Sequence, residues 1–371
     1  MRILFHLAHP AQYHMFKHVI LNLRKFGHIL KITINTKDIL EQLLISDGIE
    51  YENILPKRRK RNNIFTAFLT FLKKDFKLFR IQFSGRYDML IGTEPSLSHV
   101  GWLFRKPVFL MIEDDAYLIP EVARLSFSFA TRIVSPVSCN IGKWQNKKIE
   151  YEGFQKLAYL HPRYFLPDKR IVEDVLKEND RYFIIRLSAL SAYHDIGNVG
   201  LTDSIVREII TLLKSSGKVL ISSERELPED LKNFLFKIEI TNIHHYLYFA
   251  ELLVADSHSM CVEAAMLGTP SIRFSNYAGK VGVLDELEKR YGLTFGIPAS
   301  QPEMLYKKVK DLLSLNRLKD AWQKKRERLL DEKIDVTAFW TWLVNEYPNS
   351  LIELKSNPEV LNQFKNDLNN L

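Results

Sequence analysis

The residues best suited to chemistry follow a short apolar run in the second half of the chain. Residues 252–255 read LLVA, as a buried parallel strand should, and DSHS follows at 256–259. In an open α/β sheet, ligands bind outside the carboxyl ends of strands, and anionic groups bind at helix amino termini. The turn therefore predicts an anion site formed by Ser257, Ser259 and the amide of Met260.

A short helix is expected next, from about Met260 to Leu267, ended by Gly268 because glycine adopts a left-handed backbone at little cost. Glu263 lies four residues after Ser259, one too many for a capping-box glutamate. It shares a helix face with Met260 and Leu267, so we expect it to point inward. A carboxylate there is suited to binding two vicinal hydroxyls, as on a ribose. The alternative is an ordinary strand–turn–helix with a solvated glutamate.

A second candidate group follows the first predicted strand, Ile3 to Ala8. His9 begins the turn, and its ordinary pKa near neutrality suits a general base. The helix after this turn is predicted from apolar residues at Phe16, Val19, Ile20 and Leu23. The glycine fingerprint of dinucleotide-binding domains is absent, so a dinucleotide site is not indicated here.

An acidic triplet, Glu113, Asp114 and Asp115, follows the predicted strand 107–112. Clustered carboxylates raise one another's pKa, which suits a general base acting on an acceptor hydroxyl. The same cluster could bind a divalent cation. The alternative for at least one of the three is a solvated acidic turn.

Residues 57–83 differ in composition from the rest of the chain. The segment opens with KRRKR, and its phenylalanines and leucines then recur with roughly helical period. A basic amphipathic helix of this kind is suited to an anionic membrane surface. The alternative is a core helix whose apolar stripe packs on a sheet and whose basic run is a solvated loop. No groove-reading or base-stacking motif accompanies the basic run, so nucleic acid is not expected as a partner.

The length and composition of the chain fit a globular protein of two domains. The chain has 371 residues, 46% of them hydrophobic, and a net charge of +8, which fits an anionic partner. The two cysteines, Cys139 and Cys261, are too few for a disulfide framework or a cysteine zinc site. The first residues are too polar for a signal peptide, and no run of about eighteen apolar residues exists. We therefore expect a cytoplasmic protein, at the inner face of the membrane if residues 57–83 bind lipid.

Strands and helices alternate along most of the chain, which predicts an α/β fold of two Rossmann-like domains. A segment rich in proline and aromatic residues, 154–170, marks the linker. We place a first domain at 1–160, a second at 161–345 and a helical tail at 346–371.

Several segments resemble a known family. HPAQYHMFKHVI, FQKLAYLHP, RLSALSAYHDIG, LISSERELP and IHHYLYFAELLVADSHSMCVEAAMLGTPSIR are similar to a family of bacterial and archaeal proteins of unknown function, number 354 in its series. That family is in turn similar to UDP-N-acetylglucosamine 2-epimerases and GT-B glycosyltransferases. The resemblance covers about residues 1–300. It implies a GT-B-like fold, with two Rossmann-like domains facing a central cleft.

The resemblance also implies roles for particular residues. The turn with Ser257, Ser259 and Met260 would bind the donor diphosphate, and Glu263 the donor ribose. Arg186 and Ser188 look like phosphate ligands, and Arg273 is a further candidate for the charge that balances the diphosphate. The other expected donor-site residues are His194, Ser222, Ser223, Glu224 and His244. His9, with Glu113 or Asp114, falls in the part of the fold that holds the acceptor and the catalytic groups.

These features together predict a glycosyltransferase that uses a nucleotide-diphosphate sugar, with UDP the expected nucleotide. The acceptor is expected to be a polysaccharide or glycolipid. No metal or other cofactor is expected, because a helix amino terminus and basic side chains can stabilise the leaving diphosphate. The alternatives are a UDP-sugar 2-epimerase and a non-catalytic nucleotide-sugar-binding protein. HPAQYH stands where many such transferases have a glycine-rich loop.

Overall fold

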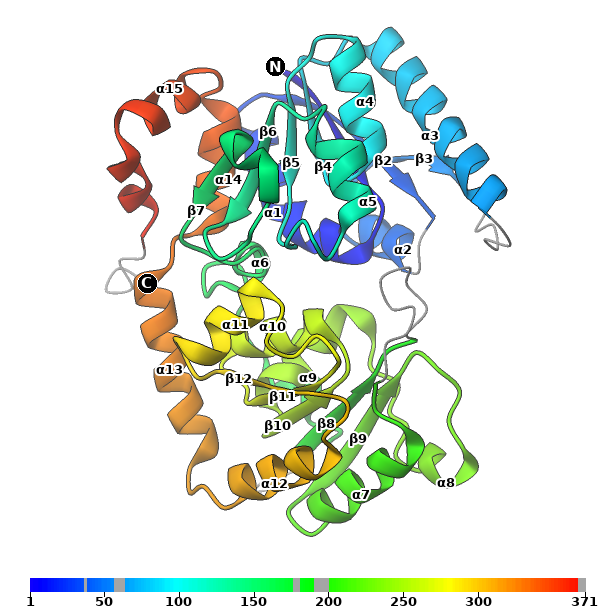
Figure 1. Ribbon diagram of the computed structural model, residues 1–371, viewed down its shortest axis with the longest axis vertical. Helices are drawn as coiled ribbons and strands as arrows, with labels where there is room; N and C mark the ends of the chain where they lie inside the picture. The colour runs from blue at the N-terminus through cyan, green and yellow to red at the C-terminus, as the bar shows by residue number, and fades with distance from the viewer. Residues whose placement is uncertain (37–38, 57–63, 176–180, 190–199, 366–371) are drawn as a thin grey trace. The chain divides into compact units, whose positions relative to one another are not determined.

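The computed structural model (Figure 1) describes residues 1–36, 39–56, 64–175, 181–189 and 200–365. The side chains of residues 64–67 and of Ile240 are also outside this description. The basic run 57–61 and the predicted donor-site residue His194 therefore lie outside the described residues.

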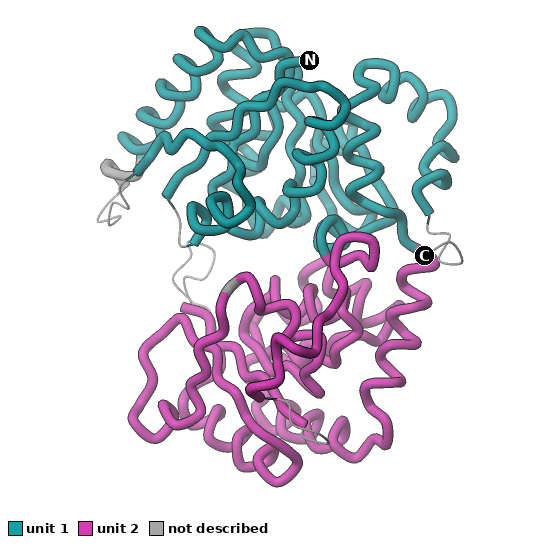
Figure 2. Tube along the Cα trace, turned by 180° about the vertical axis from the view of Figure 1, so that it is seen from behind, with its two compact units in different colours: residues 1–159, 333–366 teal, residues 160–332, 367–371 magenta. Residues whose placement is uncertain are grey.

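The chain divides into two compact units (Figure 2): residues 1–159 with 333–366, and residues 160–332 with 367–371. The first passage between units falls at Tyr159 and Leu160, next to the expected boundary at residue 160. The second falls at Glu332 and Lys333. Residues 333–345, which we expected at the end of the second domain, instead belong to the first unit.

The first unit is built on a seven-stranded parallel sheet in the order β3-β2-β1-β4-β5-β6-β7. Its inner strands β1, β4, β5 and β6 are short, mostly apolar runs buried on both faces, as parallel strands covered by helices should be, whereas the edge strands β3 and β7 are partly exposed. β1 lies inside the sheet and pairs with both β2 and β4, with Ile3 opposite Leu30 and Met89. The strands are β1 Arg2–Leu7, β2 Ile29–Asn35, β3 Glu52–Leu55, β4 Met89–Gly92, β5 Val108–Met111, β6 Arg132–Pro136 and β7 Lys148–Tyr151.

Helices connect and cover these strands. α1 buries the predicted stripe of Phe16, Val19, Ile20 and Leu23, so the periodicity of this segment predicted its inward face. Two short helices, α2 and α4, had not been predicted. The main helices before the linker are α1 Pro10–Lys25, α2 Leu40–Ser46, α3 Ile64–Gly85, α4 Pro95–Leu103 and the π-helix η1 Ala123–Phe127.

The second unit has a five-stranded parallel sheet in the order β12-β11-β10-β8-β9. The chain runs from β8 to β9 on one side of the sheet and places β10 on the other side of β8, so the order reverses between β8 and β10. The strands are β8 Tyr182–Leu187, β9 Lys218–Ser223, β10 Leu252–Ala255, β11 Ser271–Phe274 and β12 Thr294–Ile297. The longer helices are α7 Asp203–Leu213, α9 Ile243–Phe249, α10 His258–Leu267, α11 Gly282–Lys289, α12 Pro302–Leu313 and α13 Leu318–Glu332.

The last helices complete the first unit. α14 Val336–Asn345 packs on α1, where the Phe16 and Trp340 rings lie 5.9 Å apart. His28 and Asn345 are hydrogen-bonded at 2.8 Å. α15 Asn349–Ser356 follows. Phe339 and Trp340 of this segment are therefore core residues of the first unit.

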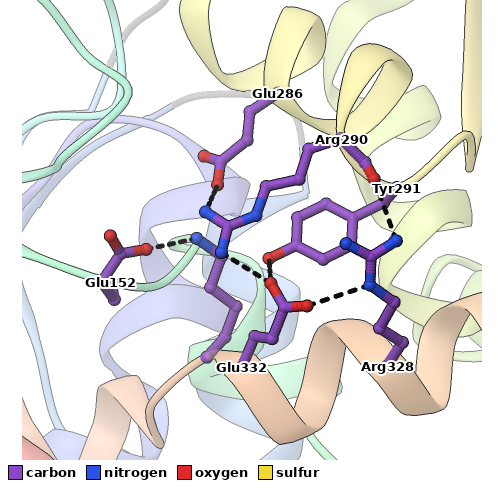
Figure 3. Close-up of polar contacts among 7 residues, drawn as sticks. Glu152, Glu286, Arg290, Tyr291, Arg328 and Glu332 are labelled. Carbon is purple, nitrogen blue, oxygen red and sulfur yellow. Dashed lines mark hydrogen bonds and ion pairs between the residues drawn. The ribbon is translucent and has the colours of Figure 1, made fainter.

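The chain crosses between the units a second time at Glu332 and Lys333, and each of these residues is held by contacts within its own unit. In the second unit, Glu332 accepts hydrogen bonds from Arg290 at 2.6 Å, Tyr291 at 2.9 Å and Arg328 at 2.9 Å (Figure 3). In the first unit, the fully buried Lys333 donates to Glu152 at 2.5 Å. No helix in the described part of the chain is long and apolar enough to cross a membrane.

His6 in β1 predicts how the stability of the protein depends on pH. Its side chain is fully buried, and burial lowers its pKa from 6.5 to about 3. Because Thr33 Oγ1 donates to the Phe5 carbonyl, His6 donates from Nδ1 to Thr33 and is neutral. The unfolded chain takes up this proton first, so stability is lost as pH falls below 6.5.

Between pH 7 and pH 5 this single site should cost the wild type about 2 kcal/mol. We expect His6→Gln to remove that loss, measured as the difference between the two proteins in chemical unfolding at each pH. Parallel pH profiles of the wild type and the variant would contradict the assignment of a neutral, buried His6.

Candidate functional site

The centre of the candidate site is Asp256, directly after β10 at the point where strand order reverses. Its side chain is 6% exposed. One carboxylate oxygen accepts from the Ser188 amide at 2.7 Å and the Ser188 hydroxyl at 2.6 Å, and the other accepts from the Leu201 amide at 3.3 Å. Burial raises the pKa of Asp256, and these hydrogen bonds and Arg225 oppose the rise. Asp256 therefore fixes the segment that follows β8.

Beside it, Arg186 at the end of β8 spans to the end of β9. It donates to Ser222 at 2.8 Å and forms an ion pair with Glu224. Glu224 also accepts from the Ala189 amide at 3.1 Å. The buried Nε of Arg186 has no hydrogen-bond partner among the described residues. The structure thus brings three predicted donor-site residues together around one guanidinium.

The amino terminus of α10 lies at the same edge of the sheet. The helix begins at His258, two residues earlier than expected, and Ser257 caps it by accepting from the Met260 amide at 3.4 Å. Gly268 ends it with φ of +67°, as predicted. His258 is hydrogen-bonded to Ser275 at 3.1 Å, which joins this helix terminus to the segment after β11.

Glu263 points into the unit, as its helix position predicted. It is 8% exposed, and its carboxylate lies 3.7 Å from Nε2 of His244 on α9. Two predicted donor-site residues from separate segments therefore form a buried pair. A largely buried carboxylate with a histidine beside it is an acceptor that few water molecules reach.

The remaining predicted donor residues fall into different places. Ser259 lies in the first turn of α10. Ser223 is used locally, because its hydroxyl donates to the Arg225 carbonyl and accepts from the Arg225 amide. Arg273 is 1% exposed and its guanidinium donates to the Tyr277 carbonyl at 3.4 Å. Burial inside the second unit therefore argues against Arg273 as a ligand of the diphosphate.

In the first unit, His9 caps α1. Its Nδ1 accepts from the Ala11 amide at 3.2 Å, so the neutral imidazole carries its proton on Nε2. The side chain is exposed. This arrangement favours His9 as a hydrogen-bond donor from Nε2, since a proton taken up on Nδ1 would disrupt the cap.

The acidic triplet separates into three environments. Glu113 accepts from the Gln155 amide at 2.5 Å and lies 3.3 Å from Lys156, and burial raises its pKa against the effect of Lys156. Asp114 is exposed. Asp115 is buried and accepts from the Asn140 amide at 2.6 Å. Asp114 alone of the three is exposed to solvent within its unit.

A polar group also follows β4, the neighbour of β1, although its residues were not among the predicted site residues. Gln12 accepts from the Ala8 amide at 2.7 Å and donates to Thr93 at 2.5 Å. Glu94, at the N-cap position of α4, forms an ion pair with Lys74. The reversal of strand order between β1 and β4 marks this position as a candidate site, but the order of the strands cannot be read from the sequence alone.

No group of three or more histidine, cysteine, aspartate or glutamate side chains in the described ranges could hold a metal ion. The polar groups at the carboxyl edge of the second sheet are a guanidinium, hydroxyls, a helix amino terminus and a buried carboxylate. That set is suited to a phosphorylated ligand with vicinal hydroxyls.

Comparison with solved structures shows the fold. The chain is similar to an MnaA–UDP co-structure from Staphylococcus aureus, with 12% identity, coverage of 95% of this chain and 98% of that one, and a TM-score of 0.69. It is similar to the Neisseria meningitidis UDP-GlcNAc 2-epimerase bound to UDP-GlcNAc, with 15% identity, coverage of 89% and 100%, and a TM-score of 0.60. It is also similar to the spinosyn rhamnosyltransferase SpnG in complex with the spinosyn aglycone, with 13% identity, coverage of 93% of this chain and 100% of that one, and a TM-score of 0.57.

At these identities the likeness establishes the fold alone. The chain has the GT-B-like fold shared by UDP-GlcNAc 2-epimerases and glycosyltransferases, with two Rossmann-like units. No protein-family profile and no curated protein matches the chain, so membership in the family of unknown function stays a prediction.

The hydrogen bonds of Asp256 predict a structural role that can be measured. Asp256→Ala leaves the Ser188 amide and hydroxyl and the Leu201 amide without their acceptor, which should destabilise the protein by about 1–3 kcal/mol. Asp230→Ala is the matched control, since Asp230 forms an exposed ion pair with Arg207. Equal thermal unfolding of the two variants would contradict this role.

Proposed function

We propose that this protein is a glycosyltransferase that moves a sugar from a nucleotide-diphosphate donor, with UDP as the nucleotide, to a polysaccharide or glycolipid acceptor. The observation that carries the proposal is the carboxyl edge of the second sheet. There, Arg186, the capped amino terminus of α10 and the buried Glu263–His244 pair come from three different segments.

Each part matches a part of the donor. The α10 amino terminus and Arg186 would bind the diphosphate, because both present N–H groups with positive charge. Arg186 would exchange Glu224 for phosphate, and this exchange costs little because the Glu224 side chain is half exposed. Glu263 would accept hydrogen bonds from the two ribose hydroxyls, with His244 holding its carboxylate in place.

The catalytic groups are proposed in the first unit. His9 and Asp114 are exposed at the carboxyl edge of the first sheet, whereas Glu113 is engaged by Gln155 and Lys156. We propose that Asp114 takes the acceptor proton and that His9 orients the acceptor from Nε2. Glu113, whose pKa is raised, is the alternative base.

No metal is required in this proposal. The negative charge that develops on the leaving diphosphate would be stabilised by Arg186 and the helix amino terminus, which are already oriented toward the edge of the sheet. We also propose a cytoplasmic protein with no nucleic-acid partner.

A UDP-sugar 2-epimerase is the second candidate, because solved structures named as UDP-GlcNAc 2-epimerases share the fold over most of the chain. An epimerase needs no acceptor. Incubation with UDP-GlcNAc alone, followed by chromatography of the nucleotide sugars, tests this candidate, since conversion to a second UDP-sugar supports epimerisation. A donor that stays unchanged alone and is consumed only when a glycan or glycolipid acceptor is added supports transfer. A non-catalytic binding protein would retain the donor without either product.

The Glu263 assignment predicts a change in UDP binding. In a thermal-shift titration, UDP at a hundred times its Kd should stabilise the wild type by about 2.7 kcal/mol. Glu263→Gln should weaken UDP binding about 10- to 100-fold, since hydrogen bonds to a charged acceptor are lost. Glu303→Gln, an exposed glutamate of α12, is the control and should bind UDP as the wild type does.

No stabilisation of the wild type by any nucleoside diphosphate would refute the donor site itself. Equal UDP affinity in Glu263→Gln and the control would refute only the ribose assignment.

A further inference from the structure

The outward face of α3 is apolar where an ordinary surface helix is polar. Phe68, Leu72, Phe76 and Phe83 are 54%, 46%, 62% and 67% exposed. Spacings of four, eight and fifteen residues place all four on one side of the helix. Three exposed phenylalanine rings on one helix face are a large apolar area to leave in water.

The opposite face of the same helix is the one that packs into the first unit. Leu78 is fully buried in the core cluster, and Gln82, 1% exposed, donates to the Tyr87 carbonyl at 2.9 Å. The core-helix alternative for residues 57–83 therefore accounts for only part of the apolar residues of α3. α3 has two apolar faces, and the core accounts for one of them.

The neighbouring elements also expose apolar side chains. α4 lies beside α3 (Figure 1) and contributes Trp102 and Leu103, 62% and 57% exposed, and the π-helix η1 contributes Leu125, 45% exposed. His99 on α4 fixes the three elements together, since it bonds to Asp75 of α3 at 3.0 Å and to the Leu125 carbonyl at 2.8 Å.

The charges around this face are mainly positive. α3 carries four basic residues and one acidic residue, Asp75, which is paired with His99. Its exposed cations are Lys73 and Arg80. Arg105 and Arg124 are exposed beside α4 and in η1, and the nearby acids Asp88 and Glu121 lie within 4 Å of Lys106 and Arg124.

A hollow adjoins Trp102. It has a volume of about 670 Å³, and its wall combines aromatic rings with cations. Its lining includes Trp102, Phe129, Arg105, Lys106 and Thr131. An aromatic and cationic wall is suited to the boundary between lipid headgroups and acyl chains, where tryptophan and basic side chains concentrate.

We propose that this surface, the α3–α4 face, binds an anionic lipid bilayer. It is defined by Phe68, Leu69, Leu72, Phe76, Phe83, Trp102, Leu103 and Leu125 together with Lys73, Arg80 and Arg105. The apolar side chains enter the interface and the cations contact anionic headgroups. A second copy of this chain is a poorer occupant, because it would bring the same positive charges together. The proposal does not depend on the transferase activity, although it would place the first unit beside a glycolipid acceptor.

The test is flotation of the full-length protein with vesicles. Wild type should float with vesicles of phosphatidylcholine containing 30% phosphatidylglycerol and not with phosphatidylcholine alone, and 0.5 M salt should weaken the binding. The triple variant Phe68→Ser, Leu72→Ser, Phe76→Ser should lose at least tenfold in vesicle affinity. Lys73→Glu with Arg80→Glu should lose about tenfold or more, on phosphatidylglycerol vesicles.

Matched controls separate the surface from general stickiness. Phe26, Ile45 and Ile352 are 62%, 66% and 66% exposed at other places in the first unit. Their triple serine variant should float as the wild type does. All substitutions are at exposed positions, and unchanged thermal unfolding confirms that each variant is folded.

Failure of the wild type to float with anionic vesicles at low salt would overturn the proposal, as would a triple variant at α3 that floats as well as the control. A change of oligomeric state in that variant, measured by sedimentation without any vesicle binding of the wild type, would instead assign the face to self-association and also overturn it. UDP binding should be unchanged in every variant, so failure here is distinguishable from failure of the donor site.

Discussion

A single buried carboxylate determines the shape of the candidate donor site. Asp256 follows β10 where the order of the strands reverses, and its oxygens accept three hydrogen bonds from the segment that follows β8. Burial would otherwise favour the protonated form, and the hydrogen bonds oppose this effect. The groups that could contact a ligand, Arg186 and the start of α10, are positioned on either side of it. The chemistry of the edge therefore depends on a residue that itself is largely hidden from solvent.

The two units use the same plan with different contents. In each, polar groups gather at the carboxyl edge of a parallel sheet, at the point where strand order reverses. In the second unit these groups are a guanidinium, hydroxyls and a buried carboxylate, which suit a phosphorylated ligand. In the first unit they are His9, the exposed Asp114 and two carboxylates paired with lysines, Glu94 with Lys74 and Glu113 with Lys156. His9 and Asp114 are the groups suited to contact an acceptor and its proton. This difference is the physical basis for assigning donor binding and catalysis to separate units.

Much of the fold was predictable because apolar runs and helical periods are local properties. The α1 stripe and the left-handed end of α10 at Gly268 followed directly from residue types. The inward position of Glu263 also followed, but its partner His244 is on another helix, and spacing says nothing about such pairs. Arg273 was a candidate for the charge that balances the diphosphate, but its residue type alone did not show that its guanidinium is buried within the unit.

The end of the second unit was predicted incorrectly, and the sequence left open which side of α3 faces the core. Residues 333–345 were expected in the second domain because they follow it in sequence, whereas packing of α14 on α1 decides their unit. The period of α3 was recognised, but a period does not tell which side faces the core. Phe68, Leu72 and Phe76 lie outward, and only the position of Leu78 against the sheet reveals it.

The most direct test of the account is calorimetric titration of the full-length protein with UDP and with uridine. The proposed site holds the diphosphate at the α10 amino terminus and Arg186, so UDP should bind at least 100-fold more tightly than uridine. Equal affinities for the two ligands, or no heat of binding with UDP, would contradict the central claim that the edge of the second sheet is a nucleoside-diphosphate site.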